Sequence, residues 1–458
     1  MLDSTVVALA LPSIRGDVGA SSEGLQWVMN GYLLTIAVLV VTAGRLGDMF
    51  GRKRVFIAGM AVFALGSVVS GAAGDQSALI LGRVLQGAGA APMLSLSLAL
   101  VCNAFPAAKQ PRALGIWAAV SAVALAIGPL AGGLLIELDW RVIFWMNLPV
   151  AAIGVAITVV AAPESTDPGA GTRIDWAGLA ALSVGLIAAV LALVQSRAWG
   201  AATISALALV GFAALFAFWL IEHRVREPIV DFELFRNGPY LGASAAAFCL
   251  VGAYWAVMFF QPQYLQDVRG HSAILSGLMI LPVTVPMVFV SPFSGRLIAR
   301  FGARRLMTCG MVFGTLGLLV LTQIDASSSY GLLLAGYLLF GIALGLVYAP
   351  MSTAAMAAMP GEKVGIASGV LAMDRVLAGA VALAAVGAVF HALLGDGHSF
   401  AAAIAGSTWV VVALCAVGVG LTWACVRDIE PPGPDPAVAG DPPVEELQHH
   451  RHHRRFHL

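Results

Sequence analysis

The amino-acid sequence predicts an all-α integral membrane protein, built from two bundles of six helices with two extra helices between them. Three observations lead to this fold class. Of the 458 residues, 59% are apolar and only 11% are charged, whereas about a quarter of the residues in a soluble domain are charged. Apolar segments of about 20 residues, the length that crosses a bilayer, recur along the chain. One basic loop sequence occurs once in each half.

Thirteen segments are long and apolar enough to be complete spanning helices. Backbone polar groups must be satisfied internally in lipid, so each of them is expected to be helical. The thirteen segments are 25–46, 55–73, 78–101, 113–136, 142–162, 176–194, 201–221, 240–260, 273–295, 306–322, 330–349, 364–394 and 402–426. A further apolar segment, residues 1–12, is too short to cross a membrane and stops at Pro12.

Basic residues lie mainly on alternate connections between these segments. Those connections and the C-terminal tail hold 19 of the 25 Lys and Arg residues, and the opposite connections hold only Arg15, Arg141, Arg197 and Arg269. The positive-inside rule places the basic side in the cytoplasm. We therefore expect a multi-pass protein of the cell (inner) membrane with a cytoplasmic C-terminus. The net charge is zero, so nothing indicates a nucleic-acid partner.

This orientation makes residues 1–12 run outward. Asp3 precedes Pro12 by about 14 Å of helix, which is about half of a ~30 Å hydrocarbon core. We therefore place Asp3 near the midplane of the bilayer. The expected protein has fourteen helices, with a partial helix 1, and this sequence begins inside that helix through a misassigned start or as a fragment.

The repeated loop indicates an internal duplication. GRLGDMFGRKRVFIAGM (44–60) recurs as GRLIARFGARRLMTCGM (295–311), with eight of seventeen positions identical. Duplicated bundles around a central site are typical of secondary transporters. The expected domains are an N-terminal six-helix bundle (1–162), a linker (163–236) that holds helices 176–194 and 201–221, a C-terminal six-helix bundle (237–427) and a disordered cytoplasmic tail (428–458). We read the His-rich end of that tail as disordered rather than metal-binding.

Several motifs resemble those of the major facilitator superfamily. GRLGDMFGRKR (44–54) is similar to its inner-loop signature, LILGRVLQGAGAA (79–91) to its helix-4 motif and GPLAGG (128–133) to its helix-5 antiporter motif. LDSTVVALALPSI, LQWVMNGYLL (25–34) and WRVIFWMNLPV (140–150) are similar to the fourteen-helix drug:proton antiporters of the EmrB/QacA type. The resemblance covers residues 2 to about 425.

Charged residues at membrane depth are candidates for proton coupling, because such charges are costly and face a cavity or a partner. Asp3 could load and release a proton, or it could be a structural acid that ties helix 1 to a neighbour. The resemblance implies that helices 1 and 4 are adjacent, so Arg83 could pair with Asp3 and assist proton transfer, or only tether the helices. On helix 13, Asp374 is a candidate for a second proton site or for a contact with cationic substrates, with a helix-pairing role as the alternative. The adjoining Arg375 matches the family pattern.

Two glycine-containing motifs are candidates for conformational roles. The inner-loop residues are Gly44, Arg45, Asp48, Gly51, Arg52 and Lys53. The resemblance implies that they form a latch at the inner ends of the bundles, and a simple topology signal is the alternative. In helix 5, Gly128 and Pro129 predict a kink, because proline removes a backbone hydrogen bond. Gly132 and Gly133 provide a small face that another helix can approach.

Together these features predict a proton-coupled secondary transporter that exports amphipathic drug-like compounds by alternating access and acts as a monomer in the lipid bilayer. The sequence has no GxxxxGK[ST] motif, so no nucleotide partner is expected. We expect no enzyme activity, cofactor or metal site. One alternative is a transporter of a single metabolite or self-made antibiotic. A more distant one is a non-transporting membrane scaffold or sensor.

Overall fold

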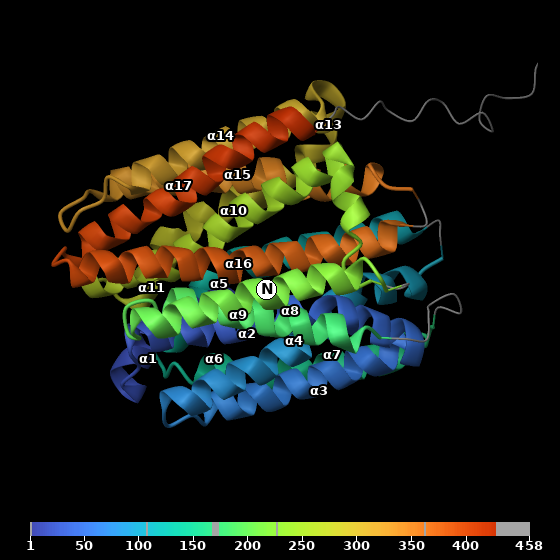
Figure 1. The fold of residues 1–458 in the computed structure, drawn as a ribbon, viewed down its shortest axis with the longest axis horizontal. Coiled ribbons are helices and arrows are strands. Elements are labelled where there is room, and N and C mark those ends of the chain that lie inside the picture. The colour runs from blue at the N-terminus through green and yellow to red at the C-terminus, as the bar shows by residue number, and fades with distance from the viewer. Residues whose placement is uncertain (1, 107–108, 167–173, 226–227, 361–362, 427–458) are drawn as a thin grey trace, which may run out of the picture.

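The computed structural model describes residues 2–106, 109–166, 174–225, 228–360 and 363–426, and its long helices lie side by side along the longest axis of the molecule (Figure 1). The α-helices are α1 (Leu2–Val18), α2 (Ser22–Phe50), α3 (Arg52–Gly71), α4 (Gln76–Ala104), α5 (Gln110–Ile136), α6 (Val142–Trp145), α7 (Asn147–Ala161), α8 (Trp176–Val194), α9 (Ala201–Glu222), α10 (Gly238–Gln263), α11 (Ala273–Ile280), α12 (Val285–Val290), α13 (Ser294–Phe301), α14 (Ala303–Leu321), α15 (Tyr330–Ala357), α16 (Val364–Gly395) and α17 (Phe400–Cys425). Shorter helical turns are η2 (Phe232–Arg236), η3 (Tyr264–Val268), η4 (Leu281–Val283) and η5 (Ser291–Phe293).

Twelve helical segments in the described part of the chain are long and apolar enough to cross a membrane. They correspond to twelve of the thirteen expected spans. The remaining one, 113–136, lies on α5, where the qualifying apolar stretch is the shorter Ile127–Ile136. Several side chains in the first half of α5 lie outside the description. The expected count of thirteen complete spans is therefore not supported.

Prolines act differently from the sequence-based expectation in two places. Pro12 does not end the first helix, because α1 continues through it to Val18. The expected span 273–295, in contrast, is not one continuous helix. The turns η4 and η5 interrupt it, each with a proline in its first two positions, Pro282 and Pro292. A proline has no amide hydrogen to donate, so the regular α-helical ladder breaks there.

The helices form two groups joined by a hairpin. In the first group, α1–α7, helix α4 packs against α2 and α3. In the second group, α10–α17, helix α10 packs against α16 and α17, and α14 packs against α15 and α17. The hairpin of α8 and α9 matches the two expected extra helices, and α8 packs against both α2 and α16, which also contact each other (Figure 1).

Small residues allow the closest helix contact in the first group, between α3 and α4. A Cβ added at Gly89 would lie 2.5 Å from the Gly59 carbonyl oxygen and 2.7 Å from the Phe63 Cα. Both neighbours are backbone atoms, which cannot rotate away. Membrane helices lack a hydrophobic driving force between them in lipid, so this close van der Waals packing is a main source of their association.

We predict that Gly89→Ala lowers the stability of the folded protein by about 1–3 kcal/mol, because the added methyl group separates α3 from α4. The apparent unfolding temperature of the detergent-solubilised protein measures this effect. Gly420→Ala on α17 is the control, since a Cβ there would meet nothing within 4 Å. Equal unfolding temperatures for the two variants would contradict the packing argument.

Candidate functional site

Asp3 and Arg83 form an ion pair inside the first group of helices. Asp3 Oδ2 lies 2.7 Å from Arg83 Nη1. Arg83 is fully buried and Asp3 is 8% exposed. Asp3 is in the first turn of α1 and Arg83 is in the second turn of α4. The contact between helices 1 and 4 that the sequence suggested is therefore present.

Neutral polar side chains from two more helices complete the surroundings of Asp3. Asn147 at the start of α7 donates a hydrogen bond from Nδ2 to Asp3 Oδ1 at 2.9 Å. Gln86 donates from Nε2 to the same oxygen at 3.3 Å and to Ser67 Oγ of α3 at 2.8 Å. Sequence reasoning did not assign these three residues. For Gln86 a signal existed, because it lies three residues after Arg83 on one helix face.

Arg83 is held on its other sides by α2 and α4. Its Nη1 also donates to Gln86 Oε1 at 2.7 Å, and its Nε donates to the Val28 carbonyl at 3.2 Å. The guanidinium group lies 4.2 Å from the ring centroid of Tyr32, a cation–π contact. We name Asp3, Ser67, Arg83, Gln86 and Asn147 the Asp3 cluster.

The chemistry available to this cluster follows from its burial. In a low-dielectric interior an ion pair is strong, and removing one charge leaves the other poorly compensated. A proton that binds Asp3 would cancel the carboxylate charge and weaken the contact with Arg83. The contact between α1 and α4 therefore depends on both charges being present.

Asp374 and Arg375 occupy a separate polar region in the second group. Asp374 lies on α16 beside α10, close to Tyr240 and Cys249. Its Oδ2 has no hydrogen-bond partner in the described part of the chain. The Arg375 guanidinium lies 5.5 Å from the ring centroid of Tyr348 on α15. The neighbours of Asp374 are thus different helices from those that form the Asp3 cluster.

The helix-5 motif lies at the junction of the two groups. A Cβ added at Gly133 would lie 2.8 Å from the Cα of Ile274 on α11, and one at Gly132 would lie 3.1 Å from the Cα of Val6 on α1. The preceding Gly128 and Pro129 are buried. The small face expected on helix 5 therefore contacts both α1 and the second group.

The inner-loop motif connects α2 to α3 through Gly51, whose φ of 111° strongly favours glycine. Arg52 Nε donates to Asp48 Oδ1 at 2.7 Å. The backbone nitrogen of Lys53 donates to Glu164 Oε1 at 3.0 Å, and its Nζ donates to the Val159 carbonyl at 2.8 Å. Sequence reasoning did not identify Glu164.

These partners all belong to α2, α3, α7 or the segment directly after α7. The motif residues Gly44 and Arg45 lie near the end of α2. A Cβ added at Gly44 would lie 3.6 Å from Ser95 Cβ, so α2 approaches α4 closely there. The loop therefore ties the first group together in this conformation. Its expected role as a latch between the two bundles remains a prediction.

Polar contacts join the two groups at the end of the molecule that holds the α1–α2 connection. Arg15 donates to Asp267 Oδ2 at 2.9 Å and to Gln263 Oε1 at 2.8 Å. Gln26 Nε2 and His391 Nε2 lie 2.9 Å apart, joining α2 to α16. These contacts hold the groups together at this end.

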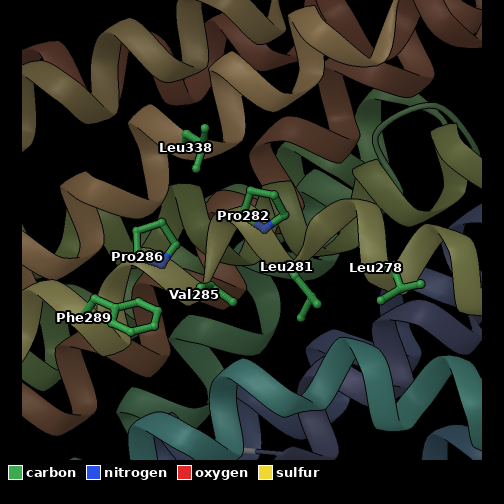
Figure 2. Close-up of a pocket in the computed structure, with 7 residues that line it drawn as sticks. All are labelled: Leu278, Leu281, Pro282, Val285, Pro286, Phe289 and Leu338. Atoms are coloured by element: carbon green, nitrogen blue, oxygen red, sulfur yellow. The ribbon is translucent and has the colours of Figure 1, made fainter.

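Figure 2 shows an apolar groove in the second group, with a volume of about 300 Å³. It is lined by Leu278, Leu281, Pro282, Val285, Pro286, Phe289 and Leu338. The broken segment α11–α12 supplies all of these residues except Leu338, which comes from α15. This lining has no charged or hydrogen-bonding side chain, so the groove has no group that could bind a proton.

Comparison with known families identifies the fold. The Major Facilitator Superfamily model matches residues 1–383. The chain belongs to this superfamily. It is 36% identical over 397 residues to multidrug resistance protein Stp of Mycobacterium tuberculosis, covering 86% of this chain and 74% of that protein. It is 33% identical over 398 residues to the tetracenomycin C resistance and export protein of Streptomyces glaucescens, with the same coverage.

A solved structure agrees with this assignment. The structure resembles an auto-inhibited POT family peptide transporter, with a TM-score of 0.68 at 15% identity, covering 95% of this chain and 97% of the other. This likeness shows the fold alone. The chain is therefore a multi-pass membrane transporter of the major facilitator superfamily and not an enzyme, as the sequence indicated. Its assignment to the fourteen-helix type remains a prediction.

We predict that Arg83→Gln destabilises the protein by about 3–5 kcal/mol, because it leaves the Asp3 carboxylate buried without its cation. The double variant Asp3→Asn with Arg83→Gln should recover part of this loss, since neither charge remains. Apparent unfolding temperatures of the parent, both single variants and the double variant form the test. Strictly additive effects would show that the two residues do not interact.

Proposed function

We propose that the protein is a proton-coupled antiporter of the drug:proton type that exports amphipathic drug-like compounds across the cell membrane. It acts as a monomer with a cytoplasmic C-terminus, and the hairpin α8–α9 is the additional helix pair between the bundles 1–162 and 237–427. The observation that carries this proposal is the buried Asp3–Arg83 ion pair. A buried charge in a spanning helix marks an ion pathway more often than a structural contact.

In this proposal, α1 couples proton binding at Asp3 to the movement of the two groups that carries the substrate across. Asp3 is near one end of this helix, and Arg15 near the other end contacts Asp267 and Gln263 of the second group. Between them, the Leu9 carbonyl accepts a hydrogen bond from Gln266 Nε2 at 3.0 Å. A change in the pairing of Asp3 thus acts on the helix that holds the two groups together. Alternating access follows when these contacts open and the opposite mouth closes.

The names of relatives support the substrate class. One relative is named for multidrug resistance and another for resistance to and export of a single antibiotic. The second name favours a specific alternative in which this chain exports one self-made antibiotic. A multidrug exporter and a single-antibiotic exporter would use the same coupling site, so only the range of exported compounds distinguishes the two functions.

We predict that Asp3→Asn abolishes proton-driven export, because an amide cannot exchange a proton. Cells that express the parent should export a fluorescent cationic dye, and a protonophore should stop this export. Asp139→Asn is the control, since it removes a half-exposed carboxylate from the same group of helices. Dye export by Asp3→Asn at the parent rate would exclude Asp3 as the coupling group. Dye retention by every form, together with export of one antibiotic, would favour the alternative.

Alternating access requires the Arg15–Asp267 contact to open in each cycle. We predict that joining cysteines at positions 15 and 267 with a short bis-methanethiosulfonate cross-linker, which bonds to each cysteine through a disulfide, stops export, and that reduction restores it. The test uses a chain whose five native cysteines have been replaced. Cysteines at 17 and 141 form the control, since Asp17 and Arg141 pair within the first group. Unchanged export after cross-linking 15 to 267 would contradict this mechanism.

A further inference from the structure

Two carboxyl groups meet at the open end of the α8–α9 hairpin, where the coupling mechanism does not use them. Asp175 immediately precedes α8, and Glu222 is the last residue of α9. Glu222 is only 5% exposed and Asp175 is partly buried. Asp175 Oδ2 and Glu222 Oε1 are both buried without a hydrogen-bond partner in the described part of the chain.

Gly178 shows that these two unpartnered oxygens face the same space. A Cβ added at Gly178 would lie 2.9 Å from Glu222 Oε1, and it would lie even closer to Asp175 Oδ2. Each oxygen is thus less than about 3 Å from one point, so the two are less than about 6 Å apart. Two ionised carboxylates at this separation repel each other, so a proton bound to one of them relieves the repulsion.

The remaining oxygens of both groups are already occupied. Asp175 Oδ1 accepts a hydrogen bond from the Gly178 amide at 2.8 Å and caps the N-terminus of α8. This position favours a negative charge on Asp175. Glu222 Oε2 accepts a hydrogen bond from the Val230 amide at 3.1 Å. Because Glu222 is the more deeply buried acid, its free oxygen Oε1 is the favoured position for a proton.

We propose that Asp175 and Glu222 form a proton-binding site, in which Glu222 holds the proton on Oε1 and directs it towards Asp175 Oδ2. The Glu222 O–H group donates its hydrogen bond to Asp175 Oδ2 either directly or through one water molecule. No bond other than the O–H bond forms or breaks. This site is distinct from the Asp3 cluster, because it lies on the hairpin between the two groups. It does not depend on the proposed function.

In the described part of the chain, the charged and titratable residues that neighbour Glu222 in sequence have other partners or are exposed. The His223 ring lies between Trp219 and Phe232, and its Nδ1 is 2.7 Å from the Trp219 carbonyl oxygen. Asp231, after Val230, pairs with Lys363 of the second group at 2.9 Å. Glu233 pairs with the same lysine, and Arg224 lies at an accessible position beyond the end of α9.

Infrared spectroscopy of the full chain in lipid nanodiscs tests the proposal. A protonated carboxyl group gives a carbonyl stretching band that an ionised carboxylate lacks. We expect an alkaline pH step to remove such a band from the parent, and we expect this pH-dependent band to be missing in Glu222→Gln. Glu164→Gln, which changes a more exposed acid at the end of the first group, should keep the parent's spectrum. The same pH-dependent band in Glu222→Gln as in the parent would overturn the proposal.

A second variant keeps the proposal testable if Glu222→Gln fails to fold. In Asp175→Asn the repelling charge is gone, so the band should disappear at a lower pH than in the parent. A band that titrates as in the parent would show that the two acids do not share a site. At constant pH, replacing a large organic cation by sodium should leave the band unchanged. Loss of the band on sodium addition would show that the acids bind a metal cation instead, and would also overturn the proposal.

Discussion

The buried Arg83 guanidinium imposes the strongest constraint on the first group of helices. A cation in the interior of a membrane bundle needs a counter-charge and hydrogen-bond acceptors, because hydrocarbon supplies neither. Asp3 supplies the charge, and Gln86 and the Val28 carbonyl supply further acceptors. Three elements, α1, α2 and α4, therefore converge on one side chain. Asn147 and Ser67 then connect α7 and α3 to the same cluster through hydrogen bonds.

The internal repeat shows that this charge is specific to one half of the molecule. A second, shorter repeat aligns GRVLQG (82–87) with GYLLFG (336–341), so the position of Arg83 in the first copy is Tyr337 in the second. Tyr337 is also fully buried, and its hydroxyl donates to Gln261 Oε1 of α10 at 2.6 Å. A buried polar contact between the equivalent helices is thus retained, but it is neutral. Such a contact carries no ion pair, so the charged pair at this position belongs to the first group.

The helices and the buried charges of the first group could be predicted from the sequence, through hydropathy and the scarcity of charges in apolar stretches. Long apolar stretches identified the helices, and Asp3 and Arg83 were conspicuous because ionisable residues are scarce in such stretches. Ser67 and Asn147 were not found, because neutral polar residues occur in membrane helices for many packing reasons. The contact of Arg15 with Asp267 joins residues 252 positions apart. It depends on how two bundles dock, which the local pattern does not encode.

Proline was the least reliable signal. The same residue type continues a helix at Pro12 and interrupts one at Pro282. A proline inside a helix leaves one carbonyl unpaired, and neighbouring helices decide whether this group can be satisfied. The outcome therefore depends on tertiary packing and not on the local sequence. Periodicity along one segment therefore could not separate the continuous helix α1 from the broken segment α11–α12.

The contacts of the α8–α9 hairpin indicate which group carries it during transport. At one end, Arg197 donates to the Ala392 carbonyl and to Asp396, both at 3.1 Å, and both belong to the second group or its loops. At the other end, Glu222 binds the Val230 amide, in the segment that leads into the second group. Contacts at both ends restrain the hairpin more than the exposed Arg197–Asp396 pair would alone. In the proposed alternating-access cycle we therefore expect the hairpin to move with the second group, and the packing of α8 against α2 to change.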